Sequence, residues 1–112
     1  MSSVPTAELH DPARDELQLA EVLRALSDPV RLQIVHVLDQ ADGEVACSQF
    51  GLPVNKSTAS HHFKVLREAG VLQARIEGTR HFHTLRRDDL DTRFPGLLDS
   101  VLRAASADTP TS

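Results

Sequence analysis

The chain has 112 residues, of which 40% are hydrophobic, and this size allows one small domain with one core. Its formal net charge is −4 and it has a single cysteine, which excludes a disulfide bond within the chain. No apolar run approaches the roughly 18 residues that cross a bilayer, and no apolar signal stretch begins the sequence. We therefore expect a soluble, cytoplasmic protein with no membrane partner.

The charge is distributed unevenly. Residues 1–53 carry nine acidic and three basic residues, whereas residues 54–88 carry three acidic and seven basic residues, a local net charge of +4. A basic segment on an acidic chain still attracts phosphate. The distribution favours a nucleic-acid-binding surface within residues 54–88.

Both ends of the chain have compositions that disfavour packing. Residues 1–14 contain two prolines among small polar residues, and residues 105–112 are mostly Ala, Ser and Thr. We expect both segments to be disordered tails. The folded domain is therefore predicted to span residues 15–104.

Two helices are predicted at the start of this domain. Leucines recur at i, i+4 and i+7 between Asp15 and Leu26, which is typical of an amphipathic helix. Asp28 is a suitable N-cap, and Pro29 suits a first helical position because its missing N–H would be unpaired there anyway. A second helix is therefore predicted from Pro29 to about Gln40.

A short helix and a longer one are predicted next. The segment from Val45 to Phe50 fits a short helix, and Gly51-Leu52-Pro53 interrupts it. A longer helix is predicted to begin near Val54 or Asn55 and to end at Gly70, a suitable residue for a helix C-terminus.

The longer helix has two chemically different faces. Ala59, Phe63 and Leu66 recur at i, i+4 and i+7, so we expect them to pack inward. Hydroxyl, imidazole and charged groups share the opposite face: Ser57, Ser60, His61, Lys64 and Glu68. Such groups hydrogen-bond to base edges and phosphates, so this helix is predicted to read DNA.

A two-stranded hairpin is predicted after the reading helix. Apolar and polar residues alternate from Leu72 to Glu77, Gly78-Thr79 forms the turn, and Arg80 to Arg86 returns. A last helical region opens near Asp88, and Pro95-Gly96 is expected to break or kink it.

This order of elements predicts a mainly α fold with a β-hairpin wing, a winged helix-turn-helix. Three runs, at residues 23–34 (LRALSDPVRLQI), 60–72 (SHHFKVLREAGVL) and 77–80 (EGTR), resemble the ArsR/SmtB family of winged helix-turn-helix repressors. The resemblance covers roughly residues 15–103. It implies a homodimer that represses transcription from a pseudo-palindromic operator, two half-sites about one helical turn apart, until an inducer of unknown identity releases it.

The first and last helices would pair across the two-fold axis by this resemblance. The dimer-interface residues would be Leu19, Leu23, Leu97, Leu98, Val101 and Leu102. The predicted DNA-binding residues lie at the start and outer face of the reading helix and on the wing. They are Asn55, Lys56, Ser57, Thr58, Ser60, His61, His62, Lys64, Arg67, Arg75, Thr79, Arg80 and His81. Arg31 either contacts a phosphate or pairs with Asp28.

Metal binding is not predicted. Metal sensors of the resembled family often carry a Cys-x-Cys pair before the reading helix, but here Cys47 is flanked by Val45 and Gln49, and residues 88–105 contain no histidine. We therefore interpret Cys47 as a small buried apolar residue. His81 and His83 lie at i and i+2 without a third ligand nearby, so we interpret them as wing residues, one partly packed.

Two alternative functions remain open at this point. One is a metal- or thiol-responsive repressor that uses Cys47, and the other is a winged-helix protein-interaction module with no DNA role. An enzyme is not expected, because no nucleophile–base arrangement, phosphate-binding Gly-rich loop or paired carboxylate stands out. No cofactor is expected either.

Overall fold

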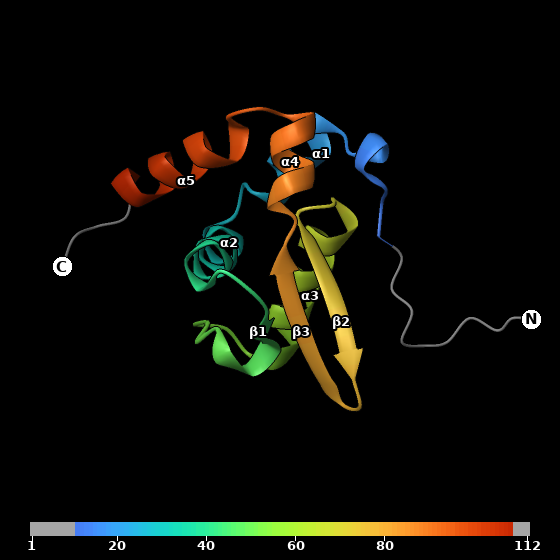
Figure 1. Ribbon diagram of the computed structural model, residues 1–112. Helices are drawn as coiled ribbons and strands as arrows, with labels where there is room; N and C mark the ends of the chain where they lie inside the picture. The colour runs from blue at the N-terminus through green and yellow to red at the C-terminus, as the bar shows by residue number, and fades with distance from the viewer. Residues whose placement is uncertain (1–10, 109–112) are drawn as a thin grey trace, which may run out of the picture.

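The computed structural model describes residues 11–108, so of the tails predicted at residues 1–14 and 105–112 only residues 1–10 and 109–112 lie outside the described part, and residues 105–108 belong to a helix. The elements are η1 (Arg14–Glu16), α1 (Leu19–Ala25), α2 (Pro29–Ala41), β1 (Val45–Ala46), η2 (Cys47–Gln49), α3 (Lys56–Glu68), β2 (Leu72–Glu77), β3 (Arg80–Leu85), α4 (Arg87–Arg93) and α5 (Leu97–Asp108). In Figure 1 the β2–β3 hairpin projects downward past α3, with α1 and α4 above it and α5 extending away from the sheet. This is the predicted winged helix-turn-helix architecture.

The first predicted helix is divided in two. The structure has a single 3-10 turn at Arg14–Glu16 and a helix that starts at Leu19, because Leu17 and Gln18 between them have extended backbone with ψ values of 132° and 130°. This extended stretch places Leu17 in the core, where only 1% of it is exposed. The prediction of a continuous helix from Asp15 to Leu26 is therefore wrong for its first turn.

The cap of the second helix is confirmed. The Asp28 carboxylate accepts hydrogen bonds from the backbone N–H groups of Val30 and Arg31 at 2.9 and 3.1 Å, and Pro29 occupies the first turn. An aspartate at this position also has a favourable interaction with the helix dipole. This cap orients α2 across the centre of the domain.

The predicted short helix at Val45 to Phe50 is wrong in its first half. Val45 and Ala46 form strand β1, which pairs antiparallel with β3, placing Val45 opposite His83 and Ala46 opposite Phe82. The sheet order is β1-β3-β2, so the wing has three strands where the sequence predicted two. Only the single turn Cys47–Gln49 remains helical.

The break in the last helical region is confirmed. Pro95 and Gly96 separate α4 from α5, and Gly96 has a φ of 82°. Leu98 and Leu102 of α5 pack into the core of the protomer, with exposures of 1% and 8%. Arg87 connects α5 to α2, because its guanidinium forms ion pairs with Asp39 of α2 and with Asp99 of α5.

The segment before α1 lies against the C-terminal end of α3. Arg86 donates a hydrogen bond to the Pro12 carbonyl at 2.7 Å, and Arg93 donates one to the Leu17 carbonyl at 3.0 Å. A Cβ at Gly70 would stand 2.0 Å from Cδ2 of Leu17, so only glycine fits beneath this segment. Ordered contacts therefore begin before residue 15.

We expect Gly70→Ala to destabilise the fold more than Gly51→Ala. Both glycines have positive φ, 89° and 63°, so each alanine costs about 1–2 kcal/mol of backbone strain. Nothing lies within 4 Å of a Cβ at Gly51, whereas Gly70→Ala adds an overlap with buried Leu17 that costs about a further 1–3 kcal/mol. Urea denaturation of both variants measures the difference, and equal losses would show that Leu17 moves aside freely.

Candidate nucleic-acid interface

The start of the reading helix is set by a side-chain cap. The Asn55 side-chain oxygen accepts a hydrogen bond from the Thr58 N–H at 2.8 Å, so α3 begins at Lys56 as predicted within two residues. Hydroxyl and cationic side chains are exposed on its outer face: Lys56, Ser57, Thr58, Ser60, His61 and Lys64. A hydroxyl-rich helix N-terminus with unpaired N–H groups is well suited to a phosphate.

The inner face of α3 is apolar, as predicted. Ala59, Phe63 and Leu66 are buried at 9%, 3% and 0% exposure. Phe63 stacks on the ring of His83 from β3 with ring centroids 4.2 Å apart and an angle of 6° between the planes. Phe50 meets Phe63 edge-on at 5.0 Å. This aromatic cluster fixes which face of α3 points outward.

His62 does not belong to the outer face. Its exposure is only 9%, and its Nδ1 lies 3.0 Å from Nη1 of Arg31 on α2. The predicted DNA contact of His62 therefore requires correction: its place about 100° round the helix from His61 turns it towards the interior.

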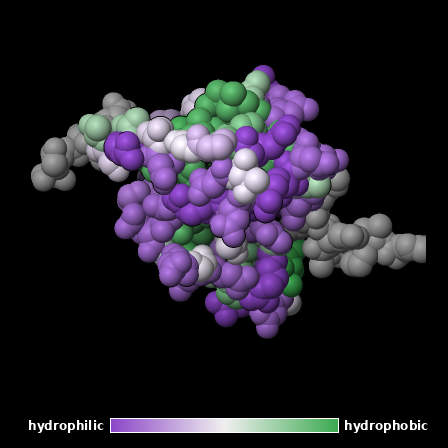
Figure 2. All heavy atoms as spheres, turned by 45° about the horizontal axis from the view of Figure 1, so that its top comes forward, coloured by the Kyte–Doolittle hydropathy of each residue, from purple (hydrophilic) through white to green (hydrophobic). Residues whose placement is uncertain are grey.

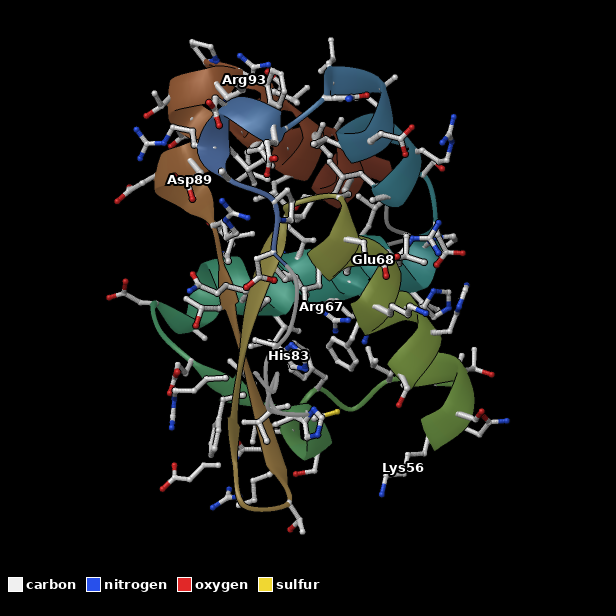
Figure 3. The ribbon with its side chains drawn as sticks, turned by 90° about the vertical axis from the view of Figure 1, so that its right-hand side faces the viewer. Lys56, Arg67, Glu68, His83, Asp89 and Arg93 are labelled. Carbon is white, nitrogen blue, oxygen red and sulfur yellow. The ribbon has the colours of Figure 1, made fainter. Side chains whose placement is uncertain are left out.

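Arg67 is also turned away from the outer face. Its Nε is buried and has no hydrogen-bond partner among residues 11–108. Figure 3 shows Arg67 and His83 next to each other between α3 and the wing, while Lys56 points away from the domain. The DNA contact predicted for Arg67 does not fit this placement.

Arg75, one of the predicted DNA-binding residues of the wing, forms ion pairs within the protein. Arg75 pairs with Glu44 at 2.8 Å and with Glu77 at 2.9 Å, so two carboxylates compensate its charge. Hydrogen bonding from Arg75 lowers the pKa of Glu44 and keeps that carboxylate ionised. Arg75 is thus engaged within the protein.

Among residues 11–108, Arg80 of the wing has an exposed guanidinium without a carboxylate partner, and Phe82 orients it. The Arg80 guanidinium carbon lies 5.0 Å from the centroid of the Phe82 ring, on which Arg75 also stacks at 4.6 Å. The sequence analysis missed the roles of Phe82 and Glu44. The alternation of polar and apolar residues along the strand could have indicated Phe82, whereas no pattern in the sequence indicated Glu44.

Some of the exposed residues of α3 and of the wing border one groove. It has a volume of about 710 Å³ and runs between the first turns of α3, the 3-10 turn η2 and the tip of the wing. Lys56 and Ser60 line it on the helix side, and Thr79, Arg80 and His81 line it on the wing side. A phosphate backbone in this position meets cations and hydroxyls from two elements at once.

Cys47 lies at the side of the same groove and is half-buried. Burial raises the pKa of its thiol, although the Lys56 ammonium acts in the opposite direction. A raised pKa favours the thiol over the thiolate that binds metals and reacts with oxidants. Across residues 11–108, no group of three or more His, Cys, Asp or Glu side chains is placed to hold a metal ion.

The predicted dimer-interface residues divide into two groups. Leu19 and Leu23 on α1 are 46% and 43% exposed, and Leu97 and Val101 on α5 are half-buried. Figure 2 shows an apolar patch at the top of the molecule, the end at which α1, α4 and α5 meet. The prediction that Leu98 and Leu102 lie in the dimer interface is wrong, because both side chains are buried in the core of the protomer.

No helix of the described part is long and apolar enough to cross a membrane.

The fold and this surface define a winged helix-turn-helix DNA-binding protein. A family profile described as a helix-turn-helix domain matches residues 26–73. The chain is 38% identical to YceK, an HTH-type transcriptional regulator of Bacillus subtilis, over 78% of this chain and 89% of that protein. It is 36% identical to the arsenical resistance operon repressor of Staphylococcus xylosus, over 66% of this chain and 71% of the repressor.

A solved structure is similar as well. The homodimeric winged helix-turn-helix DNA-binding domain of Mb0332 from Mycobacterium bovis, described as a possible ArsR-family transcriptional regulator, has a TM-score of 0.61 at 30% identity. The match covers 84% of this chain and 86% of that domain. The chain belongs to the ArsR-type family of winged helix-turn-helix transcriptional regulators.

His83 makes the stability of the fold depend on pH. Burial lowers the pKa of His83 from 6.5 to about 4, and the charges of His81 and Arg67 act in the same direction. The unfolded chain therefore binds this proton more tightly than the folded protein does. The stability that a neutral His83 contributes is present above about pH 6.5 and is lost as the pH falls towards about 4.

We expect His83→Phe to remove part of the pH dependence of folding. Phenylalanine keeps a ring against Phe63 but has no titratable group. Between about pH 7.5 and about pH 5, the wild-type protein should lose about 2 kcal/mol more of its free energy of unfolding than the variant. Urea denaturation at both pH values measures this difference, and parallel losses would contradict the buried, neutral state of His83.

Proposed function

We propose that this protein is a transcriptional repressor that binds a pseudo-palindromic operator as a homodimer and acts in the cytoplasm by occupying DNA, without catalysis. The observation that carries the proposal is the single groove bordered by the outer start of α3 and by the tip of the wing. The named relatives include a repressor, which supports the direction of regulation.

The positions of the exposed residues on α3 and the wing support different roles for them. His61 and Lys64 lie beyond the first turn of α3 on its outer face, where a helix in the major groove meets base edges. Ser57 and Thr58 lie at the helix N-terminus and fit a phosphate. Arg80 on the wing fits the backbone or the minor groove beyond.

A homodimer would double this surface. Leu19 and Leu23 leave an apolar stripe of α1 exposed in the protomer, next to the half-buried Leu97 and Val101 of α5. Exposed apolar stripes of this kind are typical of protein interfaces. The similar Mb0332 domain is homodimeric, and two reading helices on one side would match half-sites about one helical turn apart.

We expect Lys64→Ala and Arg80→Ala to weaken operator binding in different ways. Lys64→Ala should cost about 1–3 kcal/mol on the operator and much less on random DNA, because it reads bases. Arg80→Ala should weaken both DNAs alike and reduce the slope of log K against log salt by about 0.9, because one phosphate contact is lost. Fluorescence anisotropy with a duplex from the upstream region, at several salt concentrations, measures both effects.

Arg75→Ala is the matched control for Arg80→Ala. It removes the same charge from the same hairpin, but this charge is already paired with Glu44 and Glu77. The salt slope should therefore stay close to that of the wild-type protein. Binding of a protein partner with no salt-dependent DNA binding would contradict the proposal and favour an interaction module.

We expect Leu23→Glu to give folded monomers. A carboxylate on the exposed stripe of α1 would have to be buried unpaired in the dimer, which costs several kcal/mol, but it stays in water in the monomer. Sedimentation and circular dichroism measure assembly and folding separately. Gln33→Glu adds the same charge at an exposed position of α2 and should remain dimeric, whereas an unchanged Leu23→Glu dimer would exclude α1 from the interface.

A further inference from the structure

Arg31 joins three helices through one guanidinium group. Its Nε donates to the Ala25 carbonyl at the end of α1 at 2.6 Å, and its Nη1 lies 3.0 Å from Nδ1 of His62 in the middle of α3. Its Nη2 lies 3.5 Å from the Arg24 carbonyl, also on α1. The planar guanidinium fixes the directions of its donors, so these contacts define the relative position of α1 and α3.

His62 accepts the hydrogen bond from Arg31. A guanidinium has only donors, so Nδ1 of His62 must be the acceptor and the ring hydrogen must be on Nε2. His62 is buried, with 9% of the residue exposed, and the carboxylate of Asp28, the N-cap of α2, lies 3.9 Å from the same Nδ1. The contact between Arg31 and His62 is therefore enclosed where α1, α2 and α3 meet.

We propose that Arg31 and His62 are positioning residues that hold the reading helix at a fixed place relative to α1, and that neither touches DNA. The two residues together are called the α1–α3 latch. This inference rests on the proposed operator binding by a dimer in which α1 belongs to the interface. The distance between the two reading helices of such a dimer depends on how each α3 sits on its α1, and operator half-sites have a fixed spacing.

The alternative role for Arg31 is a direct phosphate contact. The engagement of its Nε and Nη1 inside the protein argues against that role, and so does the half-buried state of the side chain. The two roles predict opposite effects of Arg31→Lys on operator affinity. A lysine still attracts phosphate as a point charge. Its single ammonium group cannot reproduce the guanidinium donors that bond to α1 and α3 at the same time.

The first experiment compares operator binding by Arg31→Lys, His62→Leu and His62→Asn. Arg31→Lys and His62→Leu should each weaken operator binding about tenfold without changing the salt slope, because no phosphate contact is lost. His62→Asn should retain most of the affinity, since its side-chain oxygen replaces Nδ1 as the acceptor. A combined Arg31→Lys, His62→Leu protein should bind no more weakly than Arg31→Lys alone, because Arg31→Lys already removes the contact with His62.

Two results would overturn the latch while leaving operator binding intact. One is wild-type affinity in Arg31→Lys together with a reduced salt slope in Arg31→Gln, which would assign a phosphate contact. The other is equal loss in His62→Asn and His62→Leu, which would assign only a packing role. Circular dichroism and sedimentation of every variant separate these outcomes from unfolding or dissociation.

A second measurement does not depend on DNA. Amide hydrogen exchange on the free protein should be faster in α3 of Arg31→Lys than in the wild-type protein, with β2 and β3 unchanged. Unchanged exchange in α3 would overturn the latch even if the operator proposal holds. Faster exchange without any operator binding by the wild-type protein would instead refute the proposed function and leave the latch in place.

Discussion

The stack of Phe63 on His83 joins the reading helix to the wing, and the remaining surface follows from it. One face of α3 is buried against β3 and Phe50, so the opposite, polar face is exposed to solvent. Because β3 also carries Arg80, the same contact sets the position of the wing cation relative to Lys64. The pairing of β1 with β3 places Val45 opposite His83. One aromatic cluster therefore sets the position of α3 relative to the wing, the two elements proposed to face DNA.

Electrostatics then restrict the positive charge to a narrow surface. The chain as a whole is acidic, and the ion pairs of Arg75 with Glu44 and Glu77 compensate even part of the basic wing. Arg80 is held against Phe82 at the border of the groove. An acidic body limits nonspecific attachment to DNA, while a few oriented cations supply attraction next to the side chains that we propose read bases. The arrangement favours selectivity over strength of binding.

The sequence predicted the features that depend on local periodicity and failed on those that depend on distant partners. The inner face of α3 and the cap at Asp28 follow from helical spacing and local hydrogen bonding. Strand β1 has two residues, too few for any periodic signal, and exists because β3 pairs with it. His62 looked like another polar residue of the reading helix, since its partner Arg31 is 31 positions away. Helical spacing showed that Leu98 is apolar but not whether it faces the core or a second protomer.

Two constraints of different kinds thus act on α3. The aromatic cluster joins it to the wing, which belongs to the same DNA-facing surface and would move with it. The α1–α3 latch joins it to the helix that carries the exposed Leu19 and Leu23, which would face the second protomer. A signal alters operator affinity only if it favours one of two arrangements that differ in affinity. In the proposed dimer, a change in how the protomers meet would alter affinity by changing the spacing of the two reading helices. That spacing depends on the contact between α1 and α3, where Arg31 lies.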